Sequence, residues 1–189
     1  MIWLYLGLAL WIAAHFFKRL APGARAAMTA KMGMASKGVV AAVLLLALVL
    51  IVQGFKASEF VPLYDPPGWT RHLNNLLMLG AVALFGLGHS KSRLRGMVRH
   101  PMLMGLITWG VAHLLVNGDL ASVILFGTLG IWAVLQMQMI NRAEPAGAPW
   151  DGGSLAGDIR LGVITLVIFG VITGVHAWLG VWPFPGGAG

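Results

Sequence analysis

The stretch RHPMLMGLITWGVAHLLVNGD, residues 99–119, decides the fold because it places a histidine deep inside an apolar run. Pro101 predicts the start of a helix, since proline has no N–H to lose at the first helical position. Asn117-Gly118 predicts its end, because this pair favours a turn. His113 lies about 18 Å along the helix from Pro101, beyond the middle of a hydrocarbon layer about 30 Å thick. The sequence therefore predicts a membrane helix that carries a buried imidazole.

One face of this helix is more polar than contact with lipid requires. Steps of three and four residues place on it Met102, Gly105, Trp109, His113 and Asn117. The pattern W-x-x-A-H that runs from Trp109 to His113 occurs again from Trp11 to His15. Small residues beside an imidazole let a flat ligand or another helix approach it closely. The two histidines are candidate ligands, and interfacial histidines near helix ends are the alternative interpretation.

The composition is that of an integral membrane protein. Hydrophobic residues make up 58% of the 189 residues, charged residues make up 10%, and the mean hydropathy is +0.82, values far from those of a soluble domain. Six apolar runs span or nearly span a bilayer, namely 2–17, 38–55, 73–89, 101–116, 120–140 and 161–182. We expect an all-α fold, a polytopic transmembrane helical bundle of these six spans, in a single domain of residues 1–189.

Basic residues are distributed unequally between the two sides of such a bundle. The loops after the first, third and fifth runs hold Lys18, Arg19, Arg25, Lys31, Lys37, Lys91, Arg93, Arg95, Arg99, Arg142 and Arg160, whereas the other side holds Lys56 and Arg71. The positive-inside rule then places both termini outside the cytoplasm, in a multi-pass protein of the cell inner membrane. The net charge of +7 therefore reflects topology and not nucleic acid binding. The first loop predicts a short surface helix, with binding of anionic lipid as an alternative use of its charge.

The chain has no cysteine. This absence excludes disulfides, iron–sulfur clusters and covalent c-type haem, so any haem is held by histidine or methionine. Arg71 and Arg99 are the cations available for haem propionates. Copper bound by His100 with Met102 or Met104 is an alternative metal site, because thioethers are soft ligands.

Several motifs together resemble the NnrU family of bacterial membrane proteins. They are P-P-x-W-x-R-H-L from Pro66, R-H-P-M-L-x-G from Arg99, W-x-x-A-H-L-L from Trp109, N-G-D-L-A-S from Asn117 and L-F-G from Leu125. The resemblance covers nearly the whole chain and implies an association with nitrite and nitric oxide reduction, that is, with denitrification. The family is related, much more distantly, to the zeta-carotene isomerase of plants, a membrane enzyme that uses haem b to isomerise a cis double bond.

The resemblance to the isomerase also implies a pair of axial haem ligands. Its ligands, a histidine of an early helix and the histidine of a W-C-L-A-H motif, match His15 and His113. The isomerase has a cysteine where this chain has Gly110. A ligand switch that uses a thiolate is therefore not available, which puts isomerase chemistry by that route in doubt.

The leading hypothesis is a b-type haem protein with redox or isomerase-like chemistry on a small or lipophilic substrate. Its axial and metal-binding ligands would be His15 and His113. The other candidate cofactor-binding residues are Trp11, Trp109, Arg71, His72, Arg99 and His100. In straight helices the two axial ligands differ in depth by about 15 Å, so the pairing requires tilted helices. Pairs in one layer, His15 with His100 or His72 with His113, are the alternatives.

Two further function classes stay open. One is a non-enzymatic accessory protein that supports denitrification enzymes, which needs no catalytic residue. The other is a membrane methyltransferase, because R-H-P-x-x-x-G also opens a motif of those enzymes. The usual aromatic after the proline is replaced by Met102. A GxxxG step from Gly170 to Gly174 allows close helix contact and makes a homodimer a further expectation.

Overall fold

The computed structural model describes residues 1–145, 147 and 150–186, which form an all-α fold as predicted. Its helices are α1 (Ile2–Leu20), α2 (Pro22–Met32), α3 (Ala35–Lys56), α4 (Thr70–Leu87), the 3-10 helix η1 (Arg93–Met97), α5 (Pro101–Leu114), α6 (Leu120–Ala143) and α7 (Leu155–Trp178). Within the described residues, extended pairing is limited to an isolated bridge between Pro62 and Asp119.

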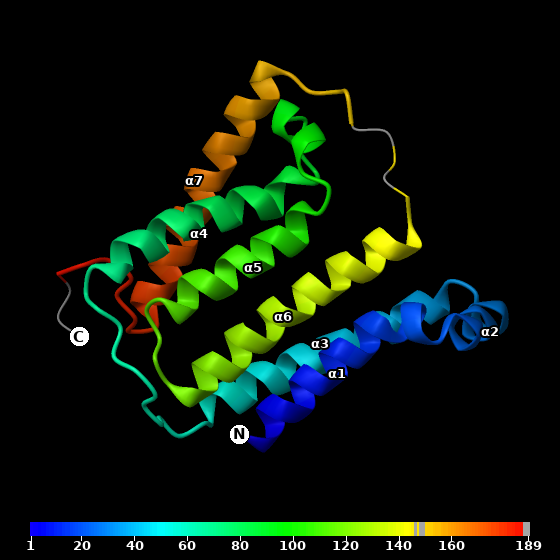
Figure 1. Ribbon diagram of the computed structural model, residues 1–189, viewed down its shortest axis with the longest axis horizontal. Coiled ribbons are helices and arrows are strands. Elements are labelled where there is room, and N and C mark those ends of the chain that lie inside the picture. Colours follow the sequence, from blue (N-terminus) through cyan, green and yellow to red (C-terminus); the bar gives the residue numbers. More distant parts are fainter. Residues whose placement is uncertain (146, 148–149, 187–189) are drawn as a thin grey trace.

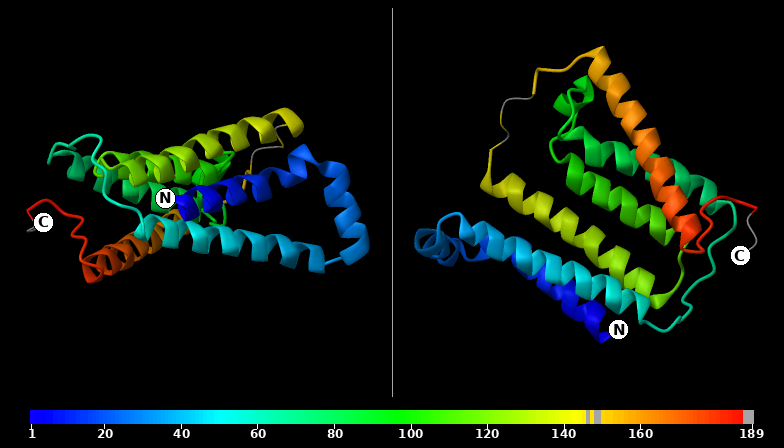
Figure 2. Two further views of the ribbon diagram at one scale, coloured as in Figure 1. Left: turned by 90° about the horizontal axis from the view of Figure 1, so that it is seen from below. Right: turned by 180° about the vertical axis from the view of Figure 1, so that it is seen from behind.

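The long helices lie side by side in an open row rather than in a closed bundle (Figure 1). Helix α1 packs on α3, both contact α6, and the row continues through α5 to α4. Helix α7 crosses α4 at the far end of the row from α1 and α3, as the view from behind also shows (Figure 2). Helix α6 is therefore the central element that joins the α1–α3 pair to the α4–α5 pair.

The helices differ in how well their length and composition suit a membrane crossing. Helices α3, α6 and α7 are long and apolar enough to cross by themselves, while α1 and α2 meet the same criterion only as a pair that is bent by 92°. Helix α5 is apolar but has 14 residues, about 21 Å of helix. By these criteria the described residues hold three spans, or four with the bent pair, and the predicted six stay a prediction.

The start of α5 follows from local sequence, whereas its end is fixed by contact with a distant loop. The helix begins at Pro101, as predicted. It ends at Leu114, two residues before the predicted boundary, where the Tyr64 hydroxyl donates hydrogen bonds to the carbonyls of Leu114 and Asn117. A side chain at Gly118 would collide with the Tyr64 carbonyl, so only glycine fits at this turn.

Helix α7 begins six residues earlier than the predicted run, at Leu155. The Ser154 hydroxyl caps it by accepting a hydrogen bond of 3.0 Å from the Gly157 N–H. The surface helix predicted in the first basic loop is confirmed as α2. Residues 146 and 148–149, between the last two predicted spans, and residues 187–189 lie outside the described residues.

The core lies where α1, α3 and α6 meet. It is built from the buried side chains Leu4, Leu8, Ile51, Ala121, Leu125, Phe126 and Leu129. Away from it, apolar side chains such as Leu45 on α3 and Leu166 on α7 are 63% and 64% exposed. Surfaces of this kind contact membrane lipid and not water.

Candidate functional site

The first candidate site surrounds His15 at the contact between α1 and α6. The His15 ring lies 4.4 Å from the Trp11 ring and 4.6 Å from the Trp132 ring, between centroids. Its Nδ1 atom is 2.9 Å from the Trp11 carbonyl oxygen, one turn earlier in α1. Trp132, which is 5% exposed, is a part of this site that the sequence analysis missed, because it comes from a helix more than a hundred residues away.

The two tryptophans beside His15 have buried indole N–H groups without a hydrogen-bond partner among the described residues. The described residues contain four buried side-chain polar atoms without a partner, and among them are the indole nitrogens of Trp11 and Trp132 and the amide oxygen of Gln136. Gln136 follows Trp132 by one helical turn. Buried polar atoms are normally satisfied, and an unsatisfied one costs about 1–3 kcal/mol. The two indole N–H groups beside His15 are therefore available to a polar partner.

The second candidate site surrounds His113 at the contact between α5 and α6. The ring stacks on Phe126 with centroids 4.5 Å apart and an interplanar angle of 26°, and it lies 5.0 Å from the Trp109 ring. Its Nδ1 atom is 2.9 Å from the Trp109 carbonyl oxygen. A Cβ atom at Gly110 would lie 3.0 Å from the Phe126 carbonyl oxygen. The glycine at this position therefore allows α5 to pack closely on α6.

The structure adds a third histidine, His176 on α7, that the sequence analysis did not select. It lies close enough to His113 to interact with it electrostatically. Its Nδ1 atom is 2.8 Å from the Ile172 carbonyl oxygen, again one turn earlier in the helix. The sequence signal was a histidine between small and apolar residues in G-V-H-A-W, without the W-x-x-A-H pattern that marked the other two.

All three membrane histidines are oriented in the same way. Because Nδ1 faces a carbonyl oxygen, it must carry the proton and donate, which leaves the Nε2 lone pair free. This tautomer is the one that binds a metal through Nε2, with the carbonyl as the outer partner that fixes the ring. None of the three Nε2 atoms has a hydrogen-bond partner among the described residues. The residues present therefore fit axial ligation of a haem iron.

His15 and His113 are not in contact with each other. Their partners on α6, Trp132 and Phe126, are six residues apart, which is about 9 Å along the helix axis. His176 lies within electrostatic range of His113, although the two rings are not in contact among the described residues. The expected pair, His15 and His113, thus lacks a direct contact. His176 is a second candidate partner for His113 that the sequence did not predict.

The remaining sequence candidates lie in other environments. The Nε2 atom of His100 is engaged with the Asn141 side-chain oxygen at 2.8 Å, and Arg99 donates to the Glu144 carbonyl at 2.8 Å. Arg71 and His72 lie in the first turn of α4, where His72 is exposed. The two methionines considered for copper, Met102 and Met104, are 52% and 39% exposed. In the part of the chain that the structure describes, no three His, Asp or Glu side chains are grouped so that they could hold a metal ion.

An apolar groove lies beside the second site. It has a volume of about 440 Å³ and runs between α5 and α6. Gly110, Gly127 and Gly130 line it together with apolar residues that include Phe126, on which His113 stacks. Its glycines leave a flat wall without polar side chains, which suits a planar or lipophilic molecule.

Comparison with known protein families agrees with the motifs. The model of the NnrU protein family matches residues 3–183. The chain belongs to the NnrU family. No curated protein and no solved structure matches it. Membership of the NnrU family fits a membrane protein associated with denitrification, and the spans described above support the membrane location.

Proposed function

We propose that this member of the NnrU family is a b-type haem protein of the bacterial inner membrane that takes part in nitrite and nitric oxide reduction. The observation that carries the proposal is the shared orientation of three membrane imidazoles, each with Nδ1 on a backbone carbonyl and Nε2 free. A bound haem would supply one-electron redox chemistry and, with one axial position open, a site for a small ligand.

His113 is the proposed first axial ligand, and two histidines compete to be the second. His15 is the partner expected from the W-x-x-A-H repeat. His176 is the partner favoured by its nearness to His113. Arg71 is the cation proposed for the propionates, because Arg99 already donates to the Glu144 carbonyl.

Redox or small-ligand chemistry suits the site better than double-bond isomerisation. A cysteine in place of Gly110 would press on the Phe126 carbonyl, because a Cβ atom there would lie 3.0 Å from it. A cysteine at this position would thus require a small shift of α6, and the chain has no thiolate there. A lipophilic substrate stays possible because of the apolar groove between α5 and α6.

The topology proposed is six membrane segments with both termini outside the cytoplasm. Contacts between loops support it, because they divide into two groups at the opposite ends of the helices (Figure 1). At one end, the N–H groups of Leu63 and Tyr64 donate to the Gly118 carbonyl. At the other end, Arg93 pairs with Asp158 and Arg19 pairs with Glu144. Consecutive loops thus alternate between the ends, as six crossings require.

Optical spectroscopy of the purified protein tests the haem proposal. We expect protein from haem-replete cells, purified in detergent, to show a Soret band, a b-type pyridine haemochrome and sharp low-spin bands on reduction. His113→Ala should lose the haem or become high-spin, because one axial nitrogen is removed. Comparison of His15→Ala with His176→Ala identifies the second ligand, since only the true partner gives the same loss.

His89→Ala is the matched control, because His89 is exposed beyond the end of α4. Its spectrum should equal that of the parent protein. A colourless parent protein from haem-replete cells, with a negative metal analysis, would overturn the cofactor proposal. The accessory role in assembly of denitrification enzymes would then be the better account, because it needs no bound cofactor.

A further inference from the structure

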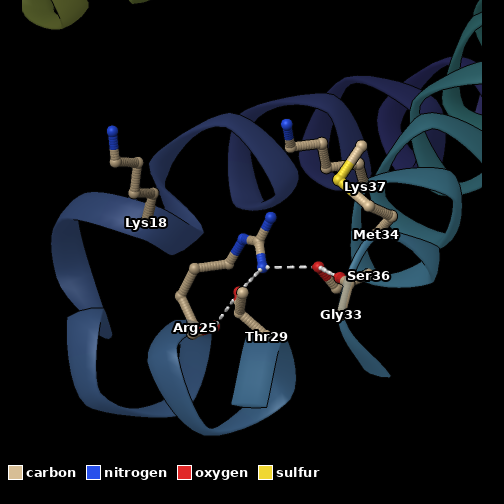
Figure 3. Close-up of a pocket in the computed structure, with 7 residues that line it drawn as sticks. All are labelled: Lys18, Arg25, Thr29, Gly33, Met34, Ser36 and Lys37. Atoms are coloured by element: carbon tan, nitrogen blue, oxygen red, sulfur yellow. Dashed lines mark hydrogen bonds between the residues drawn. The ribbon is translucent and has the colours of Figure 1, made fainter. Parts of the chain in front are cut away.

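A basic pocket lies where α1, α2 and α3 meet, at the end of α1 where Lys18 follows His15 by one helical turn. It has a volume of about 510 Å³. The residues that line it are Lys18, Arg25, Thr29, Gly33, Met34, Ser36 and Lys37. Figure 3 shows the Arg25 guanidinium reaching toward Thr29 and Ser36, with the side chains of Lys18 and Lys37 above it. Three cations and two hydroxyl groups therefore face one cavity that no acidic side chain lines.

The arginine in this pocket is held in place by its neighbours. An Nη atom of Arg25 donates to the Thr29 hydroxyl at 2.5 Å and to the Ser36 hydroxyl at 3.3 Å (Figure 3). Ser36 is 1% exposed and its own hydroxyl donates to the Gly33 carbonyl at 2.7 Å. A guanidinium fixed in this way binds an oxyanion without first losing the freedom of a mobile side chain.

The positive charge of the pocket is not cancelled within the described residues. Their two ion pairs use Arg19 and Arg93, neither of which lines the pocket. Lys18 is within electrostatic range of Glu144, but that carboxylate is held by Arg19 at 2.6 Å. Three cations close together repel one another, so an anion between them lowers the electrostatic energy.

The position of the pocket indicates an anion that belongs to the membrane. Helix α2 is bent by 92° from α1, so it runs across the end of α1. Helix α3, which is apolar over most of its length, begins directly beside the pocket. Apolar side chains on the same corner are open, with Leu20 71% and Met34 75% exposed. Such side chains suit insertion among acyl chains while the cations meet the headgroups.

We propose that this pocket binds the phosphate of an anionic phospholipid headgroup, with Arg25 as the central contact and Lys18 and Lys37 on either side. The lipid would fix the corner between α1 and α3 at the membrane surface. The proposal does not rest on haem binding, because none of the residues that line the pocket is a proposed haem ligand.

Native mass spectrometry of the full chain in detergent tests the proposal. Dioleoyl phosphatidylglycerol and dioleoyl phosphatidylcholine are added separately to delipidated protein, and the dissociation constant of the first bound lipid is measured. We expect phosphatidylglycerol to bind more tightly. Each cation removed should weaken its binding about fivefold, so the double variant Lys18→Gln/Lys37→Gln should lose about 25-fold.

Lys31→Gln is the matched control, because Lys31 lies on α2 but does not line the pocket. It should bind like the parent. The double variant keeps the proposal testable if Arg25→Gln fails to fold, since neither lysine side chain makes a hydrogen bond among the described residues. Equal binding of both lipids, or equal losses in the control and in the double variant, would overturn the proposal. Inorganic phosphate that binds as tightly as the lipid would also overturn it, in favour of a soluble anion.

Discussion

At the scale of single residues, glycine sets how closely the first two long helices approach. A Cβ atom at Gly7 would lie 2.7 Å from the Ile51 nitrogen and 2.9 Å from the Ala47 carbonyl oxygen. Both atoms belong to the backbone of α3, so they cannot move aside without moving the helix. Contact of this kind depends on dispersion forces between backbones, as in other membrane helix pairs.

We therefore expect Gly7→Ala to destabilise the protein, by about 1–3 kcal/mol for an overpacked contact. Gly38→Ala is the control, because Gly38 lies on the partner helix α3 and a Cβ atom there meets nothing within 4 Å. It should be neutral or stabilising, since alanine favours a helix over glycine by about 1 kcal/mol. Thermal unfolding in detergent, followed by circular dichroism, measures both. Equal melting temperatures for the two variants would show that the contact is not tight.

The sequence identified part of the histidine chemistry and missed the rest for a physical reason. His15 and His113 were found because a local repeat places a tryptophan one turn before each. Trp132, Gln136 and His176 act through contacts between helices, and no local pattern encodes which helix packs beside which. The role of Gly110 likewise depends on the Phe126 carbonyl across the α5–α6 contact.

At the scale of the elements, capping and charge decided the helix ends. The sequence predicted the start of α5 because Pro101 is a strong local signal. It placed the start of the last helix too late, at residue 161, where the continuous apolar run begins. In the structure the Asp158 carboxylate accepts hydrogen bonds from the Ser92 hydroxyl at 2.7 Å and the Arg93 N–H at 2.8 Å. The Asp158 side chain, in the first turn of α7, thus finds its hydrogen-bond donors in a segment that precedes it by about 65 residues, which a local sequence pattern does not reveal.

An ion pair joins the ends of α1 and α6 and predicts a dependence on pH. Arg19 donates to the Glu144 carboxylate at 2.6 Å. That hydrogen bond and the charges of Arg19, Lys18 and Arg99 hold the pKa of Glu144 below its ordinary value. Because the folded state favours the ionised form, the contribution is fully present above the ordinary pKa of about 4.3. It is lost as the pH falls through the lower pKa of the folded protein.

We expect Glu144→Gln to lower the melting temperature slightly at pH 7 and to match the parent once the pH is low enough to protonate Glu144 in the folded state, where both side chains are neutral. Glu59→Gln is the control, because Glu59 is exposed and forms no ion pair among the described residues. Its difference from the parent should not follow this pH profile. A Glu144→Gln deficit that stays constant from pH 7 to pH 3 would show that the carboxylate charge is not what matters.

At the scale of the whole molecule, composition predicted the membrane class but not the open row of helices. Hydropathy alone cannot say that α7 packs on α4 and lies away from α1 and α3, because lipid and protein surroundings favour the same apolar residues. Hydropathy also does not decide the number of crossings. Helices α4 and α5 pack on each other, and neither is among the helices that meet the length and hydropathy criterion alone. The division of loops between two ends, not hydropathy, supports six crossings.

Single-cysteine labelling tests this topology, and the chain is suited to it because it contains no cysteine. We expect a membrane-impermeant maleimide to label Asp65→Cys and Pro185→Cys from outside intact cells, after removal of any outer membrane barrier. Lys91→Cys should react only in inside-out vesicles, because α4 carries the chain across between the exposed positions 65 and 91. Labelling of Asp65→Cys and Lys91→Cys from the same side would mean that α4 does not cross. The α4–α5 pair would then enter and leave on one side, and the chain would have four crossings in place of six.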